Sequence, residues 1–452
     1  MDIIDILFGT KKKDDATYGD AKHMSWSDQR KLFASYDANG YCIDGKRFLR
    51  EKYLFQHCLY LAPTGSGKSV CITNFLLSLT SKTQLSGVVI DPSGTTQKIT
   101  EGWLTKQGFK VKCLSFNEIT SDTLRYNPLE RATKTENGIA EIAQLIVFSS
   151  GDKKNDFWTL SEKSVIENIL KALLQENQSE YPKNLFSLYK IINLLSVDED
   201  KISNFMAGHL TEDQFLEFAS FLGLEQKVRS NILATAKASL SSVSSEFIKT
   251  LTEYDNIELE KLREEKTILF INIGESKIKY YSFLISMLNT QLIEMALQEP
   301  QKKKPYLPIH FFFDEFATYK ILGFEEIVPI LRRRKCALYI YVQDINQLEQ
   351  AYGKTGSKII INNCLNKMFF ATSSIETSEY AEKLVGNTTV LINDTPRPLA
   401  LLSAQKIRGF EQWKFLYVNN SHSLVMKVKP FFKSSLKRRA NLPIPKKENR
   451  HD

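Results

Sequence analysis

The sequence is poor in cysteine and has no long apolar run. Its 452 residues include six cysteines, which form no Cys-x-x-Cys pair and no zinc-like grouping with the six histidines. This pattern excludes a disulfide framework, so a reducing cytosol fits best. No apolar run reaches about 18 residues, and the N-terminal residues lack the apolar core of a signal peptide. We therefore expect neither a secreted protein nor a membrane-spanning helix.

Glycine and proline are also scarce. With 20 Gly and 13 Pro, the chain is no low-complexity polymer, whereas 42% hydrophobic and 25% charged residues supply a sizeable core. The length is about three times that of a typical domain. We expect a globular protein with one large domain carrying an insertion, or with two to three domains.

Positive charge is concentrated at the C-terminus. The net charge is +8, and residues 421–452 contain nine Lys or Arg against two acidic residues, which leaves the remainder nearly neutral. We expect residues 426–452 to form a basic, disordered tail, because Pro443 and Pro445 interrupt it and apolar residues are few. Mere solvation, DNA binding and attraction to an acidic membrane surface are the alternatives for its role.

Short runs rich in β-branched and aromatic residues alternate with segments of helical period. Runs such as Thr267–Ile273 and Ile309–Phe313 are apolar almost throughout, which is typical of strands covered on both faces. Strands that alternate with helices predict an α/β domain with a mainly parallel central sheet. The expected strands cover residues 57–61, 87–90, 110–114, 267–273, 309–313, 337–342 and 367–371.

A different pattern fills residues 156–255. Apolar residues recur there at spacings of three and four, in SEKSVIENILKALL, NLFSLYKIINLL, TEDQFLEFASFLG and KVRSNILATAKASL. We expect an inserted all-α domain. Residues 51–155 and 256–425 would then form one α/β domain on either side of it, with residues 1–50 leading in.

The strongest chemical signal is the segment APTGSGKS at residues 62–69, between a predicted strand and a predicted helix. Backbone N–H groups of such a glycine-rich turn point at phosphates, and the helix N-terminus adds its positive dipole end. This is a P-loop in which Ala62 replaces the usual first glycine; Lys68 is expected to reach the β and γ phosphates of ATP, and Ser69 to ligate Mg²⁺. The expected nucleotide-binding residues are Thr64, Gly65, Ser66, Gly67, Lys68, Ser69 and Val70.

A P-loop needs a second acidic site, and Asp314-Glu315 supplies one after the apolar strand 309–313. In such a Walker B motif, Asp314 would hold the hydrated Mg²⁺ and Glu315 would polarise the attacking water. Two acidic residues capping the next helix are the structural alternative. Gln343 ends the following strand, where its amide could orient the water, or it is a surface glutamine.

Four consecutive cations, Arg332 to Lys335, precede that strand. Interaction with a helix C-terminus accounts for one or two of them. The remainder favour an arginine that reaches a neighbouring subunit's nucleotide or a phosphate-binding edge, against the alternative of a solvated face.

With these motifs in order, the chain resembles the TraG-like coupling proteins of type IV secretion and conjugation, which are hexameric RecA-like ATPases. The resemblance covers most of the chain. It rests on Tyr18-Gly19-Asp20-Ala21-Lys22, APTGSGKS, Asp91-Pro92, Tyr126-Asn127-Pro128-Leu129, Phe157-Trp158, FFFDEFA, Gln343 to Leu348, Tyr352-Gly353, Leu384-Val385-Gly386 and Thr388.

The resemblance implies an ATPase that delivers relaxase-bound DNA to a secretion channel. It implies that the insertion helps to recruit relaxase and DNA, and that Arg333 or its neighbours and Lys354 act on the adjacent subunit's nucleotide. Two departures stand out. Asp91-Pro92-Ser93-Gly94 has serine where the family has lysine. The family's N-terminal membrane helices are absent, so we expect a cytoplasmic protein held at the inner membrane only through a partner.

Three functions follow from this sequence. The first is an ATP-driven DNA-transfer motor, with DNA threading a homo-hexamer that contacts the relaxase and the channel proteins. The second is a DNA translocase of the FtsK or HerA type, which would not need the helical insertion. The third is a nucleotide-dependent adaptor that recruits relaxase without moving DNA.

Overall fold

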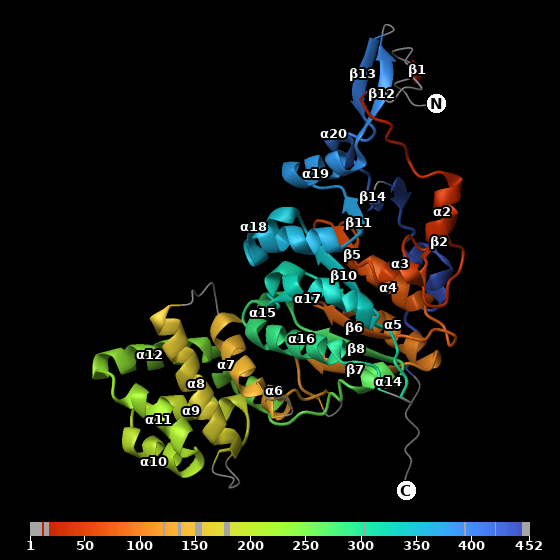
Figure 1. Ribbon diagram of the computed structural model, residues 1–452. Coiled ribbons are helices and arrows are strands. Elements are labelled where there is room, and N and C mark those ends of the chain that lie inside the picture. Colours follow the sequence, from red (N-terminus) through yellow and green to blue (C-terminus); the bar gives the residue numbers. More distant parts are fainter. Residues whose placement is uncertain are drawn as a thin grey trace.

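The computed structural model describes residues 11–12, 18–120, 123–133, 137–149, 156–175, 181–301, 304–392, 395–420 and 422–444. A nine-stranded sheet forms its centre (Figure 1). The strand order is β15 (His422–Lys427), β14 (Lys414–Asn419), β11 (Asn366–Phe370), β5 (Cys58–Leu61), β10 (Cys336–Val342), β9 (Ile309–Phe313), β6 (Ser86–Asp91), β8 (Thr267–Asn272) and β7 (Lys110–Ser115).

The strands from β11 to β7 all run parallel. Every strand expected from the sequence is present, and the prediction of a mainly parallel α/β fold is confirmed. The two remaining strands, β14 and β15, run antiparallel beside β11. They were not predicted from the sequence, although Phe415 to Val418 of β14 are apolar and buried; β15 mixes exposed and buried residues.

The side chains of successive residues in each parallel strand point to opposite faces of the pleated sheet and therefore pack into different hydrophobic cores. In β5, Leu59 and Leu61 join one cluster, whereas Cys58 and Tyr60 join the other. Helices α4 (Lys68–Ser78) and α5 (Thr95–Lys106) cover the Tyr60 face. Helices α16 (Ser282–Leu297), α17 (Phe324–Leu331) and α18 (Ile345–Asn363) cover the opposite face.

Two small sheets lie outside the central one. One contains β1 (Lys11–Lys12), β12 (Asn387–Ile392) and β13 (Thr395–Ala400), and the other contains β2 (Phe33–Ala34), β4 (Phe48–Leu49) and β3 (Tyr41–Cys42). The β12–β13 hairpin projects at the top of Figure 1. Gly19 is hydrogen bonded to Thr389 of this hairpin, so the YGDAK segment runs along it.

The remaining short helices connect these parts. They are α2 (Trp26–Leu32), α3 (Glu51–Leu54), α6 (Pro128–Ala132), α14 (Lys261–Glu264), α15 (Glu275–Ile278), α19 (Ile375–Val385) and α20 (Ala404–Arg408). Across the described ranges, no helix combines the length and the apolar character that crossing a bilayer requires.

A helical module stands at one side of the sheet, coloured yellow to green in Figure 1. It contains α8 (Phe157–Gln175), α9 (Leu185–Leu195), α10 (Glu199–His209), α11 (Glu212–Leu222), α12 (Gln226–Ser239) and α13 (Glu246–Leu251). The four periodic segments correspond to α8, α9, α11 and α12. Helix α10 was not predicted, because only Ile202 and Met206 of its residues are buried and its apolar stripe is correspondingly thin.

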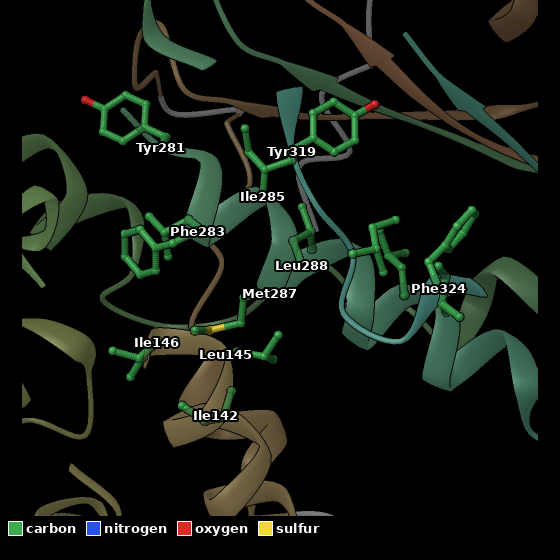
Figure 2. Packing of buried hydrophobic residues seen from close by; sticks show 14 of the residues in the cluster. Ile142, Leu145, Ile146, Tyr281, Phe283, Ile285, Met287, Leu288, Tyr319 and Phe324 are labelled. Carbon is green, nitrogen blue, oxygen red and sulfur yellow. The ribbon is translucent and has the colours of Figure 1, made fainter. Parts of the chain in front are cut away.

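Helix α7 (Gly138–Ser149) joins this module to the central domain, ahead of the expected boundary at residue 156. Figure 2 shows Ile142, Leu145 and Ile146 of α7 pointing toward Met287 of α16. The YNPL segment fixes the same junction: the Tyr126 hydroxyl donates to Gln291 Oε1 of α16 at 2.8 Å. Module and sheet therefore share one continuous apolar core.

A small cavity of about 120 Å³ at this junction is lined by Glu294 of α16, Glu141 of α7, Arg131 and Glu260. Burial, together with the nearby Glu141 carboxylate, raises the pKa of Glu294 to about 7. Since this value exceeds the unfolded value near 4.5, the folded protein binds the proton more tightly. Stability is therefore lost as pH rises from about 4.5 to about 7.

We expect Glu294→Gln to raise the free energy of unfolding by about 1–3 kcal/mol at pH 8 and by little at pH 4.5, because the amide carries no charge to bury. Denaturant unfolding at both pH values measures the difference. Glu253→Gln, at an exposed position, serves as the control. Equal effects of Glu294→Gln at both pH values would contradict the account.

The expectation of a disordered tail is wrong for residues 426–444. After β15 the chain forms two short 3-10 turns, Phe431–Lys433 and Ser435–Arg438, and then packs on α4 and α5. Arg439 Nη1 donates to the Leu77 carbonyl at 2.8 Å, and its guanidinium lies 4.5 Å from the centre of the Trp103 ring. The Leu442 carbonyl lies so close to Gly102 that a Cβ there would come within 1.9 Å of it.

Composition alone led to the wrong prediction, because a cation such as Arg439 can also bond to a carbonyl and stack on an aromatic ring. Residues 445–452 lie outside the described residues.

We expect Arg439→Ala to lower the free energy of unfolding by about 1–3 kcal/mol, since it removes a charged hydrogen bond and a cation–π contact. Arg438→Ala, one residue earlier and exposed, should change it by about 0.5 kcal/mol or less. Denaturant titration of both variants tests this difference. Equal losses for the two arginines would mean that the segment is held by charge alone.

Candidate nucleotide-binding site

The predicted site residues follow three adjacent parallel strands. The P-loop follows β5, Asp314 and Glu315 follow β9, and Gln343 follows β10, which lies between the other two. Because parallel strands end at the same edge of a sheet, these segments meet there, which is where α/β proteins bind ligands.

The P-loop turns sharply into α4. Gly65 has φ 80° and Gly67 has φ 108°, both in the left-handed region that favours glycine. The Ser66 amide and hydroxyl both donate to the Pro63 carbonyl, which closes the turn. Thr64, Gly65 and Ser69 are exposed, whereas Lys68 is only 7% exposed. This geometry leaves the loop open to an anion and places Lys68 beneath it.

Lys68 is paired with Glu315. Its Nζ lies 2.5 Å from Glu315 Oε1, and Gln343 Nε2 donates to Glu315 Oε2 at 3.4 Å. A lysine this buried would be costly without an anionic partner. The structure therefore brings together the predicted P-loop lysine, the predicted water-activating carboxylate and the predicted sensor glutamine.

Asp314 lies deeper, with 6% exposure. Burial raises its pKa to about 6, while the Lys68 ammonium acts in the opposite direction. Its Oδ1 accepts the Glu315 amide at 3.1 Å, and its carbonyl accepts the Tyr319 hydroxyl at 2.8 Å. Glu315 itself has φ 52°, an unusual conformation for a residue with a Cβ, and such strain is typical of functional sites. A buried carboxylate next to a second carboxylate supplies the oxygen ligands that a hard divalent cation prefers.

The Asp91-Pro92-Ser93-Gly94 departure has a structural explanation. Asp91 Oδ2 accepts the Gln97 amide at 3.0 Å, and Ser93 Oγ donates to Asp91 Oδ1 and accepts the Thr95 amide. Burial raises the pKa of Asp91, whereas these hydrogen bonds lower it. The segment thus forms the N-terminal cap of α5, and Ser93 takes part in that cap.

Arg333 lies away from this site, and among the described residues no hydrogen bond or ion pair links Lys354 to it. Arg333 is exposed in the short turn Arg332–Arg334, which precedes β10, whereas Gln343 follows it. One strand length, about 20 Å at the usual rise per residue, separates the two ends. Arg334 pairs with Glu299 at 3.0 Å. Lys354 is exposed on α18, next to a kink at Gly353.

One residue near the site was missed from the sequence. Trp413 lies against the P-loop: a Cβ on Gly67 would come within 2.4 Å of its ring. Trp413 precedes β14, and that strand runs antiparallel to β11, so its start lies at the edge where β5 and β11 end. Without the edge strand, nothing in the sequence connects residue 413 with residue 67.

Comparison with solved structures shows the fold. The bacterial conjugative coupling protein TrwBdeltaN70 in complex with sulphate aligns with a TM-score of 0.72 at 16% identity, over 93% of this chain and 97% of that one. The plasmid coupling protein TrwB in complex with ADP and Mg²⁺ aligns with the same TM-score at 17% identity and the same coverage.

Comparison with curated proteins shows longer relatives. The conjugal transfer protein TraG of Escherichia coli is 25% identical over 399 residues, which is 82% of this chain and 61% of TraG. VirD4 of Rhizobium radiobacter is 22% identical over 372 residues, covering 79% of this chain and 52% of VirD4. This chain thus spans about three fifths or less of these two relatives.

The sequence profile of the family described as type IV secretory system conjugative DNA transfer matches residues 13–408. That range includes the P-loop, the helical module, Asp314-Glu315 and Gln343. Because the match covers most of the chain, the protein belongs to this family of TraG-like coupling proteins.

Proposed function

We propose that this chain is an ATPase that drives DNA transfer by coupling relaxase-bound DNA to a type IV secretion channel. The observation that carries the proposal is the contact of Lys68 with Glu315, and of Glu315 with Gln343, at the ends of three adjacent strands. The chain belongs to a family of conjugative DNA transfer in type IV secretion, which is why we propose DNA as the cargo. TrwB, which shares the fold, has been solved with ADP and Mg²⁺ and with an ATP analogue, which supports ATP and Mg²⁺ as the ligands here.

Different residues of the chain would carry out the separate steps of ATP hydrolysis. Lys68 exchanges its partner Glu315 for the phosphates, which releases the carboxylate. Glu315 then holds and polarises the water, and Gln343, hydrogen bonded to it, orients that water. Ser69 and Asp314 would hold Mg²⁺, which supplies neutralisation of the phosphate charge.

The position of Arg333 favours a role between subunits. It is exposed and lies at the sheet edge opposite its own P-loop, so only another copy of the chain can bring it to a nucleotide. We therefore propose a homo-hexamer in which Arg333, and Lys354 on the exposed side of α18, complete the neighbour's site. The assembly would work at the cytoplasmic face of the inner membrane and be held there by a partner.

The helical module distinguishes the proposed function from that of a general DNA translocase. Its α7 shares apolar contacts with α16 of the central domain, so the module is positioned by the ATPase core itself. This rigid connection suits a part that presents relaxase and DNA to the motor. An adaptor that binds nucleotide without moving DNA is the second candidate.

ATP turnover of the purified protein with no DNA, with single-stranded DNA and with double-stranded DNA tests the proposal, alongside the mass in solution. A motor predicts that at least one form of DNA accelerates turnover. Turnover that is measurable but indifferent to both forms of DNA would favour the adaptor. Absence of any turnover, with the mass showing an assembled hexamer, would overturn the ATPase assignment.

A further inference from the structure

Trp413 occupies a strained and specific position beside the P-loop. Its backbone has φ 73°, in the left-handed region that a residue with a bulky side chain rarely adopts. The Val428 amide donates to the Trp413 carbonyl at 2.8 Å, and the Lys414 amide closes a turn onto Glu411. These bonds impose a conformation that costs energy, and such strain concentrates at ligand sites.

The indole ring touches the phosphate-binding loop directly. The Cβ position of Gly67 lies 2.4 Å from Cζ3 and 2.7 Å from Cε3 of the ring, so any side chain at residue 67 would displace it. Trp413 also packs edge-on against Phe432, and the two ring centres lie 6.3 Å apart. The ring is only partly buried, so part of its surface is free for a ligand.

That partly free ring lines a cavity of about 860 Å³. Met426, Val428 and Pro430 provide apolar lining beside Trp413, and Lys429 and Lys433 provide positive charge. The lining also contains the carboxylates of Asp44 and Glu411, which pair with Arg47 and Lys427. The cavity wall is tied to the P-loop helix, because Asn74 Nδ2 of α4 donates to the Lys429 carbonyl at 3.1 Å. A cavity of this size and mixed lining suits a nucleotide-sized ligand.

We propose that Trp413 is the platform on which the base of the bound nucleotide stacks, an inference that rests on the proposed ATP site. A nucleotide whose phosphates occupy the P-loop carries its base on a short ribose, within reach of a ring that touches the loop. Aromatic rings bind bases through their faces, and every base has such a face. Stacking on the indole face does not by itself distinguish one base from another, and Gln412 supplies the one side-chain amide among the described lining residues of the cavity.

Removal of the ring separates base binding from phosphate binding. Calorimetric affinities for MgATP and for magnesium tripolyphosphate, which has the phosphates without the base, are measured for wild type, Trp413→Ala and Trp413→Phe. Trp158→Ala, a half-exposed tryptophan of the helical module, is the control. Trp413→Ala should weaken MgATP about tenfold, since base stacking on an aromatic ring has roughly that effect. Tripolyphosphate binding should change about twofold or less, and Trp413→Phe should restore most of the ATP affinity.

Any of the following results would overturn the proposal. Equal losses for ATP and tripolyphosphate would make Trp413 a support for the P-loop, and unchanged ATP affinity would exclude a base contact while leaving the ATPase assignment intact. Weaker binding of a single-stranded oligonucleotide with unchanged ATP affinity would assign the aromatic surface to DNA. If wild type binds neither MgATP nor tripolyphosphate, the proposed function fails and the platform with it. Thermal unfolding of each variant confirms that the fold is retained.

Discussion

Lys68→Ala is expected to abolish ATP hydrolysis and to weaken nucleotide binding, whereas Glu315→Gln should keep ATP and Mg²⁺ bound and stop turnover. In the structure, Lys68 and Glu315 neutralise each other at 2.5 Å. Loss of the lysine removes the cation that the phosphates need and leaves Glu315 to repel them. Loss of only the Glu315 charge leaves Lys68 free for phosphate, so affinity should be kept or increased, while turnover falls by about 10²- to 10⁴-fold with the loss of water activation.

Steady-state turnover and equilibrium nucleotide binding, measured on both variants, test this division of labour. Lys98→Ala and Glu326→Gln, at exposed positions on α5 and α17, are the matched controls and should behave like wild type. If Glu315→Gln hydrolyses ATP at nearly the wild-type rate, the catalytic assignment is wrong and another carboxylate activates the water.

Arg333→Ala is expected to be as inactive as Lys68→Ala, yet mixtures of the two variants should recover part of the activity. An arginine supplied by a neighbouring subunit accelerates phosphoryl transfer by about 10³- to 10⁵-fold in related systems. Arg333 is exposed at the opposite sheet edge from its own P-loop. In a mixed assembly, some interfaces therefore pair the intact P-loop of one variant with the intact arginine of the other.

Turnover across mixing ratios measures the recovery, and Arg334→Ala is the matched control because Arg334 already pairs with Glu299. Mixtures of Arg334→Ala with Lys68→Ala should show only the activity that the Arg334 variant has alone. No recovery with Arg333→Ala, in mixtures shown to assemble together, would mean that Arg333 does not act across an interface.

Local sequence was sufficient for the parallel sheet and for the P-loop edge. Strands such as Ile309–Phe313 are buried on both faces and are apolar at every position but His310, a pattern that can be recognised from the sequence alone. Gly65, Gly67 and Lys68 lie within four consecutive residues, so the phosphate-binding loop can be predicted without tertiary information. The parallel arrangement also explains why the P-loop and Asp314-Glu315 meet, since both segments leave the same edge of the sheet, but the pairing of Lys68 with Glu315 was seen only in the structure.

Features that depend on distant contacts were missed. Strand β14 completes the sheet only by pairing with β11, and that pairing carries Trp413 to Gly67. The segment after residue 426 is polar by composition, yet Arg439 is fixed by the Leu77 carbonyl and the Trp103 ring, residues more than 300 positions away. Neither placement can be predicted from the local periodicity of the sequence, because each depends on a surface that other elements form.

Displacement of streptavidin from the end of biotinylated DNA tests the central claim, movement of DNA driven by ATP, most directly. The assay uses single-stranded and double-stranded substrates, with wild type and with Glu315→Gln as the variant that binds ATP without turning it over. We predict ATP-dependent displacement from at least one substrate by wild type and none by Glu315→Gln. Hydrolysis by wild type at full rate with no displacement from either substrate would contradict the motor.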